Sequence, residues 1–452
     1  MDKISKKRIL LLITNAYAAT NFIHSGLIKP LAQEYEVYIL SDLINSSELE
    51  KINSHFGIIT FKLTTPVPLE SWYIRQLRRL EKVIFFAFFQ VDTQKIKNQQ
   101  NSCLYIFFIN SILKLIHSLG LSKTLLQFLR RQIISVTQKN STLDDLTHYQ
   151  FSGVISSSPL DVRENTIVNF LKQKSISSLA VIISWDNLTS KGIINADHDH
   201  VFVWNEFMAA EYLRFYAVFK TVQSKIHITG IPRFDIYFQP NSIDSLCFRE
   251  KYQILSSNKI ILFATSAFIH SPNQADIVQH LTEYVSEKEN LTLIIRCHAG
   301  DDCEKYKKFE SLTFIRIWHP ERSNIPDLNV LQDLAEMLKN CDLCIQVAST
   351  IRLEAAACNK PVISIAYDGN VDLPFKRSVK RLYAYSHQLP LNELAIDHMV
   401  FNKKELFDSL DDSLSHSSLK FALNKGKLRR FIHHTSPDAT SSTIKSIRKW
   451  LG

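Results

Sequence analysis

Glycine is scarce in this sequence: the chain has 10 glycines among 452 residues, and charged residues make up 21%. This composition excludes a fibrous repeat and argues against long disordered regions. Long apolar runs are also missing. The longest are Val83–Phe89, which is far too short to cross a bilayer, and Leu104–Leu119, which polar residues interrupt. We therefore expect no transmembrane helix.

Several functional signatures are absent as well. No RNA-recognition, KH or zinc-finger pattern occurs, so we expect no nucleic-acid partner. No Asp-x-Asp motif of the kind that binds a metal-diphosphate stands out, and Cys341 and Cys344 would point to opposite faces of a strand, so we expect no obligatory metal. The seven cysteines are an odd number, and the apolar run Ile9–Ile13 is too short for a signal peptide. Both observations favour the cytoplasm and reduced thiols.

Apolar residues, in contrast, make up 45% of the chain, which is enough for two hydrophobic cores. Short apolar runs alternate with helical patterns in both halves, as is typical of parallel α/β sheets. The expected strands are Arg8–Thr14, Glu36–Leu40, Gly57–Leu63, Gly153–Ser156, Leu179–Ser184 and His200–Trp204, then Lys259–Ala264, Thr292–Arg296, Phe314–Ile317, Leu343–Val347 and Pro361–Ala366. The pattern predicts an α/β fold with two Rossmann-like domains that face a cleft.

The domain boundaries follow from changes in this pattern. Residues 1–236 are predicted to form the first domain and residues 259–425 the second, joined by a polar, irregular linker at 237–258. Residues 426–452 read as a basic amphipathic helix that could cross back to the first domain.

A helical insertion at about 69–137 interrupts the first domain and carries most of the excess charge. Ten basic and two acidic residues between Ser71 and Gln132 give it a net charge of +8, out of +9 for the whole chain. Its cations alternate with aromatic residues at helical spacing, a combination that favours contact with anionic lipid headgroups. The alternative is that the aromatic side chains are buried in the core. The residues concerned are Arg75, Arg78, Arg79, Lys82, Phe85, Phe86, Phe88 and Phe89.

The most informative motif runs from Cys341 to Asp368, where a buried strand turns into a helix at Ser349 and Thr350. A helix N-terminus presents unpaired N–H groups, and the two hydroxyls would add donors for the phosphates of a nucleotide. Glu354 follows one turn later on the same face, within reach of ribose hydroxyls. The structural alternative is an N-cap followed by a solvated glutamate. Because ligands bind at the carboxyl edge of open α/β sheets, we favour the nucleotide site.

Two other strands of the second domain end in polar residues that would face the same edge. These are Thr265 and Ser266 after the first strand, and Arg296 and His298 after the second. Arg296 or His298 would neutralise a leaving phosphate or hold the base. His298 is equally well explained as a polar loop residue.

In the first domain, the loop after Val181–Ser184 offers a carboxylate, Asp186, beside Trp185, with Asn187 and Lys191 nearby. A carboxylate in a partly desolvated site suits the general base of a transfer reaction. The alternative is an Asx-turn that only shapes the loop. The loop Asn15–Ser25, which includes His24, is the other candidate for acceptor binding and catalysis.

These motifs resemble the GT-B enzymes related to CDP-glycerol glycerophosphotransferases, which polymerise teichoic acids. The order matches from about Leu179 to Asp368, through Trp185…Lys191-Gly192, Gly230–Asp235, Arg296-Cys-His298 and Ser349-Thr350. Three features depart from the family. Asp186 stands where the family has a histidine, its presumed base; no proline follows His298; and the family's Asp-Tyr-Ser-Ser is Val-Ala-Ser-Thr at 347–350. The layout is also similar to that of bacterial sialyltransferases and Kdo transferases, which use CMP-sugars, and of UDP-N-acetylglucosamine 2-epimerases.

Together, motifs and resemblance predict a transferase that moves a nucleotide-activated sugar or polyol-phosphate onto a glycan or lipid-linked acceptor. We expect a CMP-, CDP- or UDP-linked donor, no separate cofactor, and action at the inner face of the cytoplasmic membrane in cell-surface polysaccharide synthesis. The alternatives are a UDP-sugar 2-epimerase and a non-catalytic GT-B-like binding protein. The predicted catalytic residues are Asp186, His24 and His298; the donor site comprises Thr265, Ser266, Arg296, His298, Ser349, Thr350 and Glu354, and the acceptor site Asn15, Ser25, Trp185, Asn187 and Lys191.

Overall fold

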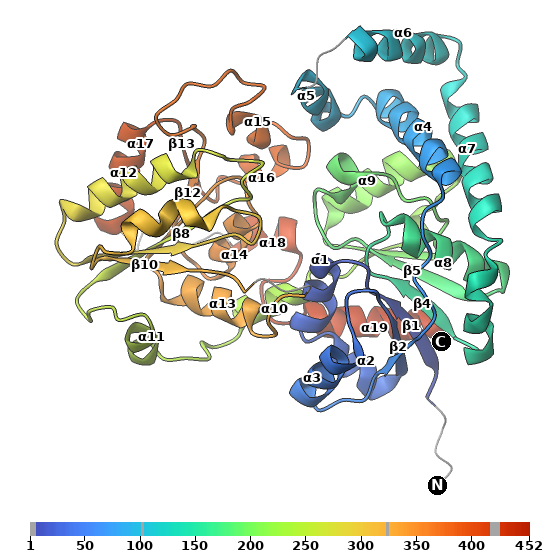
Figure 1. Ribbon diagram of the computed structural model, residues 1–452, viewed down its shortest axis with the longest axis horizontal. Helices are drawn as coiled ribbons and strands as arrows, with labels where there is room; N and C mark the ends of the chain where they lie inside the picture. Colours follow the sequence, from blue (N-terminus) through green and yellow to red (C-terminus); the bar gives the residue numbers. More distant parts are fainter. Residues whose placement is uncertain (1–5, 101–103, 322–324, 416–424) are drawn as a thin grey trace. The chain divides into compact units, whose positions relative to one another are not determined.

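The computed structural model describes residues 6–100, 104–321, 325–415 and 425–452. By its internal contacts the chain forms two compact units, residues 1–233 with 438–452, and residues 234–437. Each unit is built on one parallel β-sheet (Figure 1). The prediction of an α/β fold with two parallel sheets is therefore confirmed.

The first unit has a sheet of seven strands in the order β3-β2-β1-β4-β5-β6-β7. All four residues from Ile9 to Leu12 in β1 are fully buried, because helices cover both faces of the sheet. The strands are β1 (Arg8–Leu12), β2 (Glu36–Leu40), β3 (Phe61–Lys62), β4 (Gly153–Ser156), β5 (Ser177–Val181), β6 (His200–Val203) and β7 (Ile226–Ile228). The helices are α1 (Ala16–Ala19), α2 (Ile28–Glu34), α3 (Ser46–Phe56), α4 (Trp72–Phe89), α5 (Asp92–Gln100), α6 (Leu104–Ser118), α7 (Ser122–Thr137), α8 (Val162–Gln173), α9 (Glu206–Tyr216) and α19 (Ala439–Leu451).

The second unit has a sheet of six strands in the order β10-β9-β8-β11-β12-β13. Counted from β8, this is the 3-2-1-4-5-6 order of a Rossmann fold. The strands are β8 (Lys259–Ala264), β9 (Leu291–Arg296), β10 (Ile315–Trp318), β11 (Leu343–Gln346), β12 (Val362–Ile365) and β13 (His398–Val400). The helices are α10 (Asp235–Phe238), α11 (Ser245–Lys251), α12 (Gln274–Ser286), α13 (Val330–Asn340), α14 (Ile351–Ala357), α15 (Lys380–Tyr383), α16 (Leu389–Glu393), α17 (Lys403–Ser415) and α18 (Lys425–Ile432).

Two strands were missed by the sequence pattern. Strands β7 and β13 have three residues each, too few to show a period, and each includes a histidine. Segment 237–258 is also more regular than expected. It contains α11, whose Phe248 is fully buried, so it is not simply an irregular linker.

The C-terminal segment forms two helices rather than one. Helix α18 belongs to the second unit and α19 to the first, with His433 in the left-handed region at φ 69° and Pro437 in the break between them. Helix α19 (red in Figure 1) packs on the first sheet, where Trp450 Nε1 donates to Ser177 Oγ at 2.8 Å. An added Cβ at Gly153 would come within 2.7 Å of the Trp450 ring, so glycine is required there for this close approach.

The insertion forms helices α4 to α7, and no helix in the described part of the chain is long and apolar enough to cross a membrane. A buried ion pair ties α4 to α7, with Arg130 Nε 2.9 Å from Glu81 Oε1. Contrary to the expectation that its aromatic residues face lipid, Phe85 and Phe86 are buried. Phe85 packs against Phe215 and Tyr216 of α9, because this face of α4 covers the core.

Candidate functional site

The turn between β11 and α14 lies at the switch point of the second sheet, where the strand order reverses between β8 and β11. Ligands of Rossmann-like sheets bind at this point. Ala348 adopts a left-handed conformation with φ 43°, and its N–H donates to the Tyr383 hydroxyl at 2.9 Å. The Ser349 N–H donates to Gln346 Oε1 at 2.6 Å, and the Ile351 N–H donates to Ser349 Oγ at 3.3 Å.

These contacts revise how the turn would bind phosphate. The N–H groups of Ala348, Ser349 and Ile351 already have acceptors within the chain, so they are not open donors as the sequence suggested. Ser349 and Thr350 are both partly exposed. The partial exposure of both residues leaves their hydroxyls as candidate donors to a ligand.

A buried polar network lies beneath the turn. Arg352 is fully buried, and its guanidinium donates to Asp397 Oδ1 at 2.7 Å, to Asn392 Oδ1 at 2.9 Å and to Gln388 Oε1 at 3.0 Å. Gln388 Nε2 in turn donates to the carbonyl of Ala348 at 3.3 Å. The network therefore fixes the conformation of the turn that carries Ser349 and Thr350.

Glu354 is 1% exposed, so the interpretation as a solvated helix residue is wrong. Burial lowers the pKa of the Arg296 guanidinium, and the charges of Tyr237 and Glu354 oppose that shift. The effect of its charge means that Glu354 lies near Arg296. The Arg296 guanidinium carbon lies 4.5 Å from the centre of the Trp318 ring. Within the described residues, Arg296 Nε is buried and has no hydrogen-bond acceptor.

The ends of β8 and β9 are brought together as the sequence suggested. Thr265 Oγ1 accepts from the N–H of His298 at 2.9 Å, and His298 Nδ1 accepts from the N–H of Gly300 at 2.9 Å. Nδ1 is therefore the unprotonated nitrogen of a neutral ring, which leaves Nε2–H as a donor. Burial, followed by the charge of Arg296, lowers the pKa of His298. Both backbone groups of Ser266 are held by the side chain of Gln274.

The switch point of the first sheet lies between β1 and β4, and it places Asn15 beside Ser158. Asn15 Nδ2 donates to Ser158 Oγ at 2.8 Å, and Asn15 Oδ1 caps α1. The Ser25 hydroxyl donates to the carbonyl of Asn21 at 2.7 Å, so this predicted acceptor residue is engaged in its own turn. His24 is 7% exposed.

A buried carboxylate, Glu164, supports this edge and was not anticipated. It accepts hydrogen bonds from Thr14 Oγ1 at 2.8 Å, from Ser156 Oγ at 2.7 Å and from the N–H of Ser158 at 2.8 Å. The next strands along the sheet, β2 and β3, open into a pocket of 570 Å³. It is lined by Ser41, Asp42, Ser46, Lys62, Leu63, Thr64, Thr65, Pro66, Val67, Leu69 and Arg163.

Asp186 lies in the loop that follows β5, and its carboxylate is held within that loop. Ser184 Oγ donates to Oδ1 at 2.6 Å and Ser190 Oγ donates to Oδ2 at 3.0 Å, while Lys191 Nζ is 3.3 Å from Oδ2. These contacts, from two serine hydroxyls and a lysine, shape the loop and orient the carboxylate. Trp185 is 5% exposed and Asn187 half-buried.

The insertion also contacts this loop. Lys97 Nζ donates to the carbonyl of Ser190 at 2.9 Å, and Lys82 Nζ donates to the carbonyl of Lys191 at 3.2 Å. Burial, with a smaller contribution from the charge of Lys191, lowers the pKa of Lys97 to about 8. The loop that carries Asp186 is thus braced by helices α4 and α5.

Comparison with known proteins identifies the family of the chain. Residues 188–445 match the family described as CDP-Glycerol:Poly(glycerophosphate) glycerophosphotransferase. This match covers more than half of the chain, which therefore belongs to that family. No match was found among curated proteins.

Solved structures of the GT-B kind share the fold. The UDP-GlcNAc 2-epimerase from Neisseria meningitidis bound to UDP-GlcNAc has a TM-score of 0.57 at 11% identity, covering 98% of this chain and 100% of that one. The S. aureus MnaA–UDP co-structure has a TM-score of 0.54 at 13% identity, with coverages of 98% and 97%. A glycosyltransferase from Rickettsia africae has a TM-score of 0.52 at 14% identity, with coverages of 99% and 98%. At these identities the likeness establishes the fold.

Proposed function

We propose that this protein transfers a sugar or polyol-phosphate unit from a nucleotide-linked donor to a hydroxyl acceptor. The observation that carries the proposal is the braced turn at the switch point of the second sheet, in a chain of the glycerophosphotransferase family. A CDP-linked donor agrees with the family description, and a UDP-linked donor with the ligands of the similar structures.

In this proposal the second unit holds the donor. The hydroxyls of Ser349 and Thr350 and the Nε2–H of His298 donate to phosphate oxygens, and Arg296 neutralises the charge that the leaving nucleotide gains. Thr265 and Ser266 position the loop of His298 and the end of β8. Glu354 is buried beside Arg296 and holds it in place, so it acts on the donor through Arg296 rather than by the contact with the ribose that the sequence had suggested.

The chemical step needs a base for the acceptor. An acceptor oxygen attacks the phosphorus of a polyol-phosphate donor or the anomeric carbon of a sugar donor. The bond to the leaving nucleotide breaks, and the acceptor proton passes to a carboxylate or imidazole. We assign this role to Asp186, with His24 as the second candidate. Asn15, the Asp186 loop and the pocket beside Asp42 form the acceptor site of the first unit.

We further propose that the acceptor is a glycan or lipid-linked polymer of the cell envelope and that the insertion holds the enzyme at the inner face of the cytoplasmic membrane. The insertion supports this with exposed apolar side chains interspersed with exposed cations. The exposed apolar residues are Trp72, Tyr73, Leu80, Val83, Ile112, Leu115, Leu119, Leu121, Phe128 and Val136. The exposed cations among them are Arg75, Arg79, Lys95, Lys114, Lys123 and Arg131.

An assay of donor turnover tests the proposed function against its main alternative. The purified protein is incubated with CDP-glycerol, UDP-GlcNAc or a CMP-sugar, with and without poly(glycerophosphate) or short glycans as acceptors. A transferase releases nucleotide in proportion to the acceptor that is extended. An epimerase, which the similar structures make the second candidate, converts UDP-GlcNAc without any acceptor. Donor left intact under every condition would contradict both activities.

Substitution of Asp186 tests its role as the base. Asp186→Asn retains an oxygen for one of the two serine hydroxyls, so the loop should persist. We expect kcat to fall about 10²- to 10⁴-fold with unchanged nucleotide affinity. The matched control is Asp197→Asn in the same unit, where Lys225 Nζ is 3.2 Å from the carboxylate. Equal turnover of the two variants would remove Asp186 from the mechanism.

A further inference from the structure

The ends of β9 and β10 bring two metal-ligand side chains to one face of the second sheet. These strands pair in parallel with Arg296 opposite Trp318, and the N–H of Cys297 donates to the carbonyl of Trp318 at 3.0 Å. The next residues in register are therefore Cys297 and His319. Because side chains that are in register on neighbouring strands share a face, these two point to the same side.

A third ligand reaches the same place from the loop that follows β9. Cys303 begins a 3₁₀-helix (Cys303–Phe309) that Asp301 anchors. The Asp301 carboxylate accepts from Lys305 Nζ and from the Tyr306 hydroxyl, both at 2.7 Å. As a result, the ligand atoms of Cys297, Cys303 and His319 all lie within 4.8 Å of one another.

The donor set and its exposure suit a transition-metal ion. Two sulfurs and one imidazole nitrogen are ligands that zinc prefers, and a tetrahedral ion requires them about 3.5–3.8 Å apart. Two thiolates would cancel the charge of the ion. Cys297 is buried, Cys303 half-buried and His319 exposed, so the group is closed toward the core and open toward solvent.

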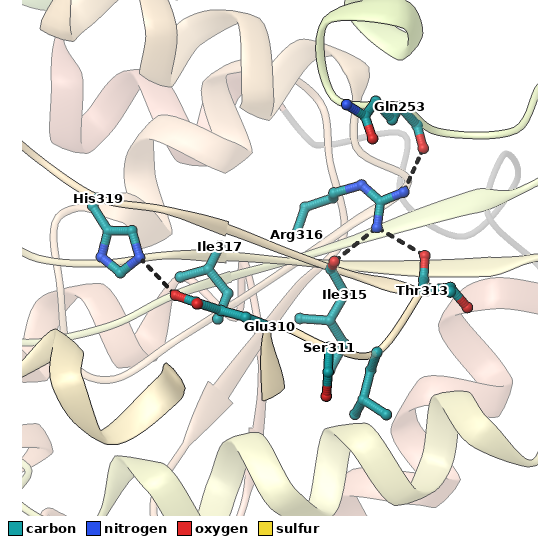
Figure 2. Close-up of a pocket in the computed structure, with 9 residues that line it drawn as sticks. Gln253, Glu310, Ser311, Thr313, Ile315, Arg316, Ile317 and His319 are labelled. Carbon is teal, nitrogen blue, oxygen red and sulfur yellow. Dashed lines mark hydrogen bonds and ion pairs between the residues drawn. The ribbon is translucent and has the colours of Figure 1, made fainter. Parts of the chain in front are cut away.

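A possible ligand lies close to the fourth coordination position of the ion. Glu310 Oε1 lies 3.6 Å from His319 Nε2, as Figure 2 shows, and both side chains line an open pocket of 440 Å³. The Glu310 carboxylate or a water molecule would supply the fourth ligand.

The alternative explanation is that the two cysteines only fill space in the core. The pair Cys341 and Cys344 is of that kind: both are fully buried, and no histidine or carboxylate converges on them to form a ligand group. Among the described residues, no group of three such ligands other than Cys297, Cys303 and His319 is found. His319 comes from a separate strand and is exposed, so it is not needed to pack the core.

We propose that Cys297, Cys303 and His319 bind a structural zinc ion that fastens the loop after β9 to the end of β10. The loop from Cys297 to Cys303 includes His298, a residue of the proposed donor site. The ion would therefore fix the position of His298 relative to the sheet. The proposal concerns residues outside the donor site and stands without the proposed function.

The test is the metal content of the full-length protein, expressed without a histidine tag, supplied with zinc and purified under a thiol-free reductant. We expect about one zinc per chain by inductively coupled plasma mass spectrometry. Cys303→Ser and His319→Ala should each lower zinc content at least about tenfold, while the matched control Cys358→Ser retains it. Circular dichroism establishes that each variant is folded.

Cobalt replaces zinc in a second measurement that identifies the ligands. Co²⁺ added to the metal-free protein should produce thiolate-to-metal charge-transfer absorption, and Cys303→Ser should weaken it. Folded protein that takes up no zinc or cobalt would overturn the proposal. Zinc retained at the wild-type level by both Cys303→Ser and His319→Ala would also overturn it.

Discussion

At the scale of single residues, Glu164 is a buried titratable group of the first unit whose pKa bears on stability. It is fully buried and its hydrogen-bond donors are neutral, without a cationic partner among the described contacts. Burial raises its pKa to about 7, although the hydrogen bonds from Ser156, Ser158 and Thr14 oppose the shift. The folded protein therefore holds this proton at pH values where the unfolded chain has released it.

This difference predicts a loss of stability with rising pH. The contribution of Glu164 is complete below its ordinary pKa of 4.5 and lost as pH rises to about 7. The total is roughly 3 kcal/mol at 1.36 kcal/mol per pH unit. We expect Glu164→Gln, which does not titrate, to remove this slope. The measurement is the free energy of unfolding in urea at pH 5 and pH 7.5 for both proteins.

The difference between the two proteins is the quantity to compare, because other groups titrate in the same range. Burial lowers the pKa of His198 to about 3, so its contribution rises with pH up to about 6.5 and partly cancels that of Glu164. His198 is present in both proteins and drops out of the difference. Parallel pH dependence of the wild type and Glu164→Gln would contradict the interpretation.

The partners of buried polar residues such as Glu164 are hard to predict from a sequence. Thr265 and His298 could be predicted to meet because both follow neighbouring parallel strands. Glu164 lies inside a helix pattern, and nothing nearby in the sequence indicates that Thr14 is its partner. Arg352 and Asp397 are likewise 45 positions apart. Only the fold brings such partners together.

At the scale of elements, the turn from β11 to α14 depends on the buried pair of Arg352 and Asp397. Asp397→Ala would leave the Arg352 charge buried without its carboxylate, which costs about 3–5 kcal/mol. The exposed pair of Lys307 and Glu304, 2.6 Å apart, provides the matched control in the same unit. Glu304→Ala should cost less than about 1 kcal/mol. Chemical unfolding of both variants tests this, and equal costs would show that the network does not stabilise the turn.

The insertion, helices α4 to α7, carries several exposed apolar side chains. Leu115 lies on α6 and Leu119 just after its end, and they are 58% and 61% exposed. Together with the adjacent Lys114, they would insert into an anionic membrane surface, where each cation contributes about 1 kcal/mol to the binding free energy. We expect Leu115→Glu with Leu119→Glu to weaken binding to phosphatidylglycerol vesicles at least about tenfold in cosedimentation.

The control for this experiment lies outside the insertion. Leu246 and Leu255 are 67% and 69% exposed in the second unit, and changing both to Glu should leave vesicle binding unchanged. Binding that both double variants weaken equally, or that phosphatidylcholine vesicles support as well, would contradict a membrane role for the insertion.

At the scale of the whole molecule, the sequence patterns were sufficient to predict two parallel α/β sheets. Strands such as Ile9–Leu12 and Leu343–Gln346 are buried on both faces, so they appear as continuous apolar runs. The break between α18 and α19 was not predicted, although Pro437 and the polar residues around it mark it in the sequence. Strand order was not predicted either, since pairing between β8 and β11 depends on contacts distant in sequence.

Nucleotide binding tests the central claim most directly. Isothermal titration with CMP, CDP, UDP, GDP and dTDP should find at least one nucleotide that binds, and at a hundred times its Kd that nucleotide should stabilise the protein by about 2.7 kcal/mol. Ser349→Ala with Thr350→Val should raise its Kd at least about tenfold. Thr282→Val, whose hydroxyl only bonds within α12, should not. No binding by any of the five nucleotides, or equal affinity in both variants, would contradict a donor site at this turn.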